Sequence, residues 1–111
     1  MKFMMIYCTD PELVLDPVEE AELDRELMAW CEELSKRGVR LGGAELAAPA
    51  RARTLRARGG ETIVTDGPFA ETKEFVAGYD ILECADLDEA AAMVARNPAI
   101  RIGSIEIRAF A

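Results

Sequence analysis

Hydrophobic positions begin as one continuous run, KFMMIYC at residues 2–8, which has the length of a single β-strand. Because side chains alternate along a strand, both faces of this one are apolar, with Phe3, Met5 and Tyr7 on one and Met4, Ile6 and Cys8 on the other. A strand of this kind is expected at the centre of a sheet and covered on both sides.

A long amphipathic helix follows. Asp16 is placed to cap it, Pro17 suits its first position, and Glu19 completes a capping box with Asp16. Apolar residues then recur at helical spacing until Gly38 ends the helix, namely Leu23, Leu27, Trp30, Cys31 and Leu34.

The middle of the chain has a β pattern interrupted by glycine. VRLGGAEL at residues 39–46 predicts a strand with a bulge at its Gly–Gly pair. The segments TLRAR and ETIVT predict a hairpin, because Gly59–Gly60 between them suits a tight primed turn. A turn at Asp66–Gly67–Pro68 closes this region.

The last third repeats the order of strand, helix and strand. VAGYDILEC at residues 76–84 predicts a strand, and Asp86 with Glu89 predicts the start of a second helix. Asn97–Pro98 is expected to end that helix. SIEIRAF at residues 104–110 predicts a final strand with its isoleucines facing inward.

The element order is β-α-β-(β-β)-β-α-β in a single domain spanning residues 1–111, an α+β ferredoxin-like fold with an added hairpin. Two helices cover only one face of such a sheet. Since the first strand is apolar on both faces, we expect a second subunit on the other face, in a homodimer packed sheet to sheet.

Composition narrows the possible chemistry. The chain has no histidine, which removes the commonest general base and the commonest metal ligand, so no histidine-based metal site is expected. We expect no metal, although carboxylates alone can hold Mg²⁺, and no cofactor, since no GxGxxG, P-loop or EF-hand pattern occurs. A formal net charge of −8 disfavours binding to nucleic acid or to anionic membranes. Three widely spaced cysteines, without a CxxC pair, are typical of packed free thiols in a cytoplasmic protein.

The stretch TDGPFAETKE, residues 65–74, contains the most distinctive candidate site. Asp66, Gly67 and Pro68 suit a tight turn with Phe69 placed in the core, so the stretch has a purely structural interpretation. Its chemical interpretation makes Asp66 a general acid or base whose pKa is raised by burial beside Phe69. The candidate ligand-binding residues are Glu71, Lys73, Glu74 and Tyr79. A tyrosine in a strand, such as Tyr7 or Tyr79, is more often a core residue than a ligand donor.

Several segments together resemble the YCII-related family, in its DGPF-type branch: MKFMMIY, the helix with Trp30, VTDGPFAETKE, AGYDILE, LDEAAAMVARNP and GSIEIRAF. The resemblance implies a dimeric α/β barrel, in which two ferredoxin-like sheets pack face to face. It also implies lyase-like or dehydrochlorinase-like relatives that use a His–Asp pair, and a regulatory link to a sigma factor. DGPF-type relatives often have histidine just before the proline after the second helix, where this chain has Asn97.

Three functions stay open. The first is a small-molecule-binding or regulatory module, with a possible sigma-factor partner. The second is a histidine-independent lyase or isomerase that uses Asp66 on a small acidic compound. The third is a purely structural role for the DGPF turn. Neither the substrate nor the existence of turnover follows from the sequence.

Overall fold

The computed structural model describes residues 1–68 and 73–111. Four antiparallel strands form the main sheet in the order β2-β5-β1-β6, and β3 and β4 form a separate two-stranded hairpin. The strands are β1 (Lys2–Thr9), β2 (Arg40–Glu45), β3 (Arg53–Arg58), β4 (Glu61–Asp66), β5 (Phe75–Glu83) and β6 (Gly103–Ala109). The α-helices are α1 (Pro17–Lys36) and α2 (Leu87–Val94), and two short 3-10 helices span Pro49–Arg51 and Pro98–Ile102.

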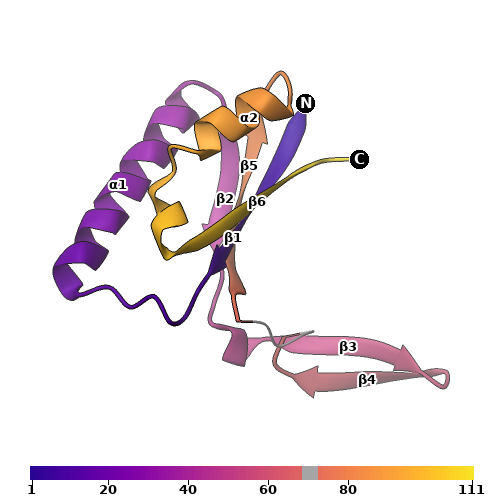
Figure 1. Cartoon of the computed structure of the whole chain (residues 1–111). Coiled ribbons are helices and arrows are strands. Elements are labelled where there is room, and N and C mark those ends of the chain that lie inside the picture. The colour runs from indigo at the N-terminus through magenta and orange to yellow at the C-terminus, as the bar shows by residue number, and fades with distance from the viewer. Residues whose placement is uncertain (69–72) are drawn as a thin grey trace.

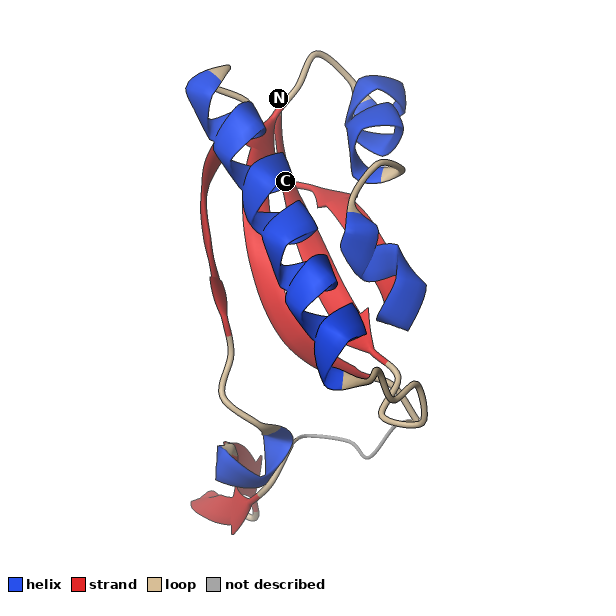
Figure 2. Ribbon diagram, turned by 90° about the vertical axis from the view of Figure 1, so that its left-hand side faces the viewer, coloured by secondary structure: helices blue, strands red, loops and turns tan. Residues whose placement is uncertain are grey.

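The strand order and the two helices are consistent with the expected ferredoxin-like α+β arrangement. Figure 2 shows α1 and α2 on the same face of the main sheet. The first strand lies between β5 and β6, so the prediction of a central first strand is confirmed. We call the opposite face of the sheet the outer face; none of the described residues forms a helix on it.

Both α-helices begin where local sequence chemistry placed them. Asp16 accepts a hydrogen bond from the Glu19 backbone N–H at 2.8 Å, and the Glu19 carboxylate accepts from the Asp16 backbone N–H. Gly38 follows α1 with a φ of 72°, a left-handed conformation that glycine adopts without strain. The second helix ends at Val94, earlier than Asn97–Pro98 predicted, because Asn97 instead caps the short helix Pro98–Ile102.

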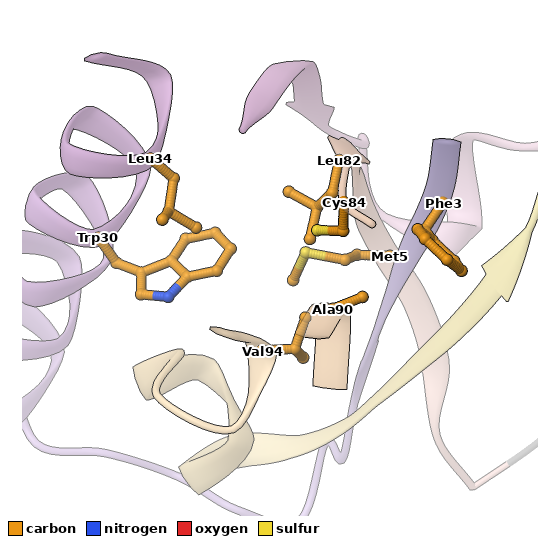
Figure 3. Close-up of a cluster of buried hydrophobic side chains, with 8 residues drawn as sticks. All are labelled: Phe3, Met5, Trp30, Leu34, Leu82, Cys84, Ala90 and Val94. Carbon is orange, nitrogen blue, oxygen red and sulfur yellow. The ribbon is translucent and has the colours of Figure 1, made fainter. Parts of the chain in front are cut away.

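The hydrophobic core fills the layer between the sheet and the helices (Figure 3). Phe3 and Met5 of β1 and Leu82 of β5 are fully buried there, and α1 adds Trp30 and Leu34. The Trp30 indole N–H also donates to the Met93 carbonyl at 3.2 Å, so its polar atom is satisfied.

The β3–β4 hairpin stands apart from this core. In Figure 1 it projects from one end of the sheet, on the side away from the helices, and Figure 2 agrees. We call this hairpin, residues 53–66, the arm. Its turn at Gly59–Gly60 has positive φ at both residues, as predicted for a primed turn.

Candidate functional site

A cavity of about 280 Å³ opens between α1 and the main sheet, near the end of the sheet from which the arm projects. Apolar side chains from the helix layer form part of its wall, including Leu23, Leu27 and Ile102. Two exposed carboxylates, Asp24 and Glu45, also line it. The cavity is large enough for a small organic molecule and combines an apolar wall with a few polar groups.

Asp80 is the buried charge of this cavity. Its residue is 3% exposed, and its carboxylate accepts two hydrogen bonds from neighbouring strands. The Arg40 guanidinium donates from Nε to Oδ1 at 2.8 Å, and the Tyr7 hydroxyl donates to Oδ2 at 2.5 Å. A carboxylate without such donors would be very costly to bury, so Arg40 and Tyr7 together permit its position.

The Tyr7 hydroxyl keeps its proton in this setting. Burial, the hydrogen bond to Asp80 and the charge of Asp80 raise the pKa of Tyr7 well above its ordinary value of 10.0. Burial disfavours the phenolate because it removes the water that would stabilise the charge. Asp80 disfavours it because a second negative charge would stand beside a buried carboxylate. Tyr7 is therefore a fixed donor towards Asp80.

Asn97 fixes the other side of the Tyr7 hydroxyl. Its residue is 2% exposed, and its amide Nδ2 donates to the Tyr7 oxygen at 2.9 Å. The Ala99 backbone N–H donates to Asn97 Oδ1 at 2.9 Å, which orients the amide so that Nδ2 faces Tyr7. Asn97, Tyr7, Asp80 and Arg40 thus form one continuous chain of hydrogen bonds, which we call the buried network.

A glycine in β2 makes room for the buried network. A Cβ atom at Gly43 would lie 2.0 Å from Asp80 Oδ1 and 2.4 Å from the Tyr79 carbonyl oxygen. Both distances are far below van der Waals contact, so only glycine allows β2 to approach Asp80 so closely. The Gly–Gly pair therefore has a second role beyond the register shift observed between Arg40 and Gly42.

Four of the candidate site residues lie within the described chain, and one of them borders the cavity. Tyr79 lines it next to Asp80, although strand alternation directs the Tyr79 side chain towards the outer face. Asp66 lies at the end of β4, with its side chain 92% exposed and 3.7 Å from the Arg53 guanidinium. Lys73 pairs with Glu12 at 3.2 Å, and Glu74 accepts from Ser104 Oγ at 2.7 Å.

Two expectations fall on residues that the structure leaves undescribed. Glu71, a candidate ligand-binding residue, and Phe69, the expected core contact of Asp66, both lie outside the described residues. The general acid or base role of Asp66 stays a prediction, since it depends on burial beside Phe69.

Sequence reasoning missed Arg40 and Asp80 altogether. A signal was present, because Asp80 interrupts the apolar strand segment AGYDILE on the face that it shares with Leu82. A lone charged residue on a buried strand face needs a partner. Arg40, in the neighbouring strand β2, supplies it.

Metal binding gains no support from the part of the chain that the structure describes. No group of three or more cysteine, aspartate or glutamate side chains there is arranged to hold an ion. Among the same residues, no helix is long and apolar enough to cross a membrane.

Comparison with known proteins places the chain in a family. Residues 1–110 match the model of the YCII-related domain. The chain belongs to the YCII-related family. An uncharacterised protein from Rhizobium meliloti (strain 1021), R00369, is 38% identical over 112 residues that cover 96% of this YCII-related chain and 90% of that relative.

A solved structure supports the fold of the YCII-related chain. It is 5-chloro-2-hydroxyhydroquinone dehydrochlorinase (TftG) from Burkholderia phenoliruptrix AC1100, in complex with 2,5-dihydroxybenzoquinone. The two share 17% sequence identity with a TM-score of 0.54, over 100% of this chain and 94% of TftG. At this identity the likeness shows a common fold and carries no activity across.

Proposed function

We propose that this YCII-related protein is a homodimeric small-molecule-binding module whose ligand occupies the cavity beside Asp80. The observation that carries the proposal is the buried network at the cavity wall. A buried ion pair is weak evidence for stability, since well-packed apolar residues of similar volume often serve as well. A network of hydrogen-bonded polar groups at the wall of an open cavity is better explained by ligand recognition.

The groups around the cavity favour a particular class of ligand. Arg40 uses Nε to hold Asp80, and its remaining N–H groups make no hydrogen bond to any residue that the structure describes. They are available to an oxygen of a ligand carboxylate or phenolate. Asp24 and Glu45 repel a multiply charged anion, so the proposed ligand is a small apolar or aromatic compound with at most one negative charge.

The binding proposal is tested by filling the cavity. In Leu27→Trp the larger ring occupies the cavity, whereas in Met28→Trp it extends into solvent, because Met28 is 72% exposed. Both proteins and the wild type are heated with a panel of small aromatic and aliphatic monocarboxylic acids and phenols. We expect one class to stabilise the wild type and Met28→Trp, by about 2.7 kcal/mol at a hundred times the dissociation constant, and not Leu27→Trp.

Two results would count against ligand binding at this cavity. One is a compound that stabilises all three proteins equally, because its site would then lie elsewhere. The other is an absence of stabilisation across the whole panel.

A lyase or isomerase acting on a small acidic compound is the second candidate. One observation favours it: Asp80 is a buried carboxylate at the cavity wall and a candidate general base. The structural neighbour TftG is a dehydrochlorinase, which is compatible with this candidate. Asp80 has the buried position that the sequence-based hypothesis gave to Asp66. The test is to incubate any stabilising compound with the protein and follow it by NMR, where conversion abolished in Asp80→Asn supports an enzyme and an unchanged spectrum supports a binding module.

We also propose that the chain belongs to the DGPF-type branch of its family. The segment DGPFAETKE supports membership of the DGPF-type branch of the YCII-related family. The regulatory link to a sigma factor and the cytoplasmic location stay predictions. Asn97 occupies the position at which many DGPF-type relatives have histidine, which favours binding over His–Asp chemistry of their kind.

A further inference from the structure

The arm is not stabilised by its own fold. Every side chain of β3 and β4 is exposed except Thr54, which is only half-buried. A two-stranded hairpin alone is at best marginally stable in water. The arm therefore needs a surface to pack against, and the core of its own chain does not provide one.

One face of the arm is built for such packing. The register places Leu55 opposite Val64 and Ala57 opposite Thr62, so these side chains share a face. Leu55 is 65% exposed and Val64 is 55% exposed. The other face carries Ile63 opposite Arg56, next to the paired Arg58 and Glu61, so it is more polar.

The outer face of the main sheet is the complementary unfilled surface. Strand alternation and register bring half-buried apolar side chains together at its centre, namely Met4, Ile6, Tyr79 and Ile81. None of these belongs to the helix-side core cluster or packs against it. Each copy of the chain thus carries one uncovered sheet face and one unsupported arm, and the arm projects on the same side as that face (Figure 1).

We infer that the arm of one subunit clasps the body of a second copy, with Leu55 and Val64 against it, in a two-fold dimer whose outer faces meet. This inference rests on the proposed homodimer and adds that the arm holds the two subunits together. Six-residue strands make the arm about 20 Å long, whereas packed sheets lie about 10 Å apart, so the arm reaches past the partner's sheet.

Charge and symmetry also favour a second copy as the occupant. The arm carries three arginines against two acids, while the whole chain has a formal net charge of −8, so a positive arm meets a negative body. In a two-fold dimer the contact of an arm with the partner's body occurs twice, so both arms are packed against a surface.

The test compares two acid substitutions on opposite faces of the arm. Leu55→Asp places a charge in the inferred contact, and Ile63→Asp places the same charge on the other face of the same hairpin. By sedimentation we expect the wild type and Ile63→Asp to be dimers, and Leu55→Asp to dissociate at least tenfold more readily. Val64→Asp is expected to behave as Leu55→Asp does.

Hydrogen exchange identifies the arm directly and does not depend on the variants. We expect amides of β3 and β4 in the wild-type protein to lose protection on dilution into the monomer range, while those of β1 and β5 keep theirs. Exchange in the arm that is fast at every concentration would overturn the inference.

The results of these experiments distinguish failure of the arm contact from failure of the homodimer proposal. If Ile81→Asp on the outer face dissociates the dimer and Leu55→Asp does not, the homodimer stands without the clasp. A wild-type protein that is monomeric at micromolar concentration would overturn both. The filling of the cavity by Leu27→Trp does not bear on either result.

Discussion

The main sheet and the arm are both antiparallel β-structure, yet they differ in what supports them. In the sheet, β1 and β5 bury Phe3, Met5 and Leu82 against two helices. In the arm, the paired Leu55 and Val64 are exposed. The difference shows that strand pairing sets the geometry of both regions, whereas burial within the chain stabilises only the main sheet.

The largest difference between the main sheet and the arm is expected when one leucine is truncated in each. Leu82→Ala removes a fully buried side chain and is expected to lower the free energy of unfolding by about 2–5 kcal/mol. Leu55→Ala, at a concentration where the protein is monomeric, is expected to change it by less than about 0.5 kcal/mol. Urea denaturation measures both, and equal losses would mean that the arm packs within its own chain.

A smaller effect is expected where β2 approaches the buried network. Gly43→Ala places a methyl group 2.0 Å from Asp80 Oδ1 and should lower the free energy of unfolding by about 3 kcal/mol. Gly42→Ala is the matched control, because no atom lies within 4 Å of its Cβ and its φ is not positive, so a change of less than about 1 kcal/mol is expected. Denaturant titration measures the free energy of unfolding of both variants. Equal losses of stability would show that β2 is not tightly packed against Asp80.

The smallest expected effect concerns the Tyr7 hydroxyl. Tyr7→Phe leaves Asp80 and Asn97 each without one hydrogen-bond partner and should cost roughly 1–2 kcal/mol at neutral pH. Tyr79→Phe, which keeps the buried network intact, serves as the control.

The same pair of variants tests the raised pKa of Tyr7. Above about pH 10 an unfolded tyrosine releases its proton while folded Tyr7 keeps it, so the unfolded state binds fewer protons and stability falls as pH rises. The wild type and Tyr79→Phe should show this alkaline loss, measured as melting temperature between pH 8 and 11. In Tyr7→Phe the loss should be shallower. A residual slope is expected from the three cysteine thiols, whose pKa values burial also raises.

Local chemistry made much of the fold predictable. Asp16, Pro17 and Glu19 define the start of α1 within a few residues of sequence, and Gly59–Gly60 defines the arm turn in the same way. The central position of β1 followed from its two apolar faces. These features depend on near neighbours, which a sequence displays directly.

The candidate site was less predictable because its members are distant in sequence. Tyr7 and Asp80 are separated by 73 positions, and Tyr7 and Asn97 by 90. Tyr7 lies in β1 and Asp80 in β5, and only the register between these strands shows that the two side chains share a face of the sheet. The direction of the arm is likewise a tertiary property, since its sequence specifies a hairpin and nothing about where that hairpin points.

The position of the arm in the chain has one more consequence. It lies between β2 and β5, which are hydrogen-bonded neighbours in the main sheet with Glu45 opposite Gly78. Neighbouring antiparallel strands need only a short turn between them. The segment from 46 to 74 is therefore an insertion in a hairpin connection, and the order of the four strands does not depend on it. The arm and the cavity therefore belong to different parts of the chain, since none of the described residues that line the cavity lies between 46 and 74.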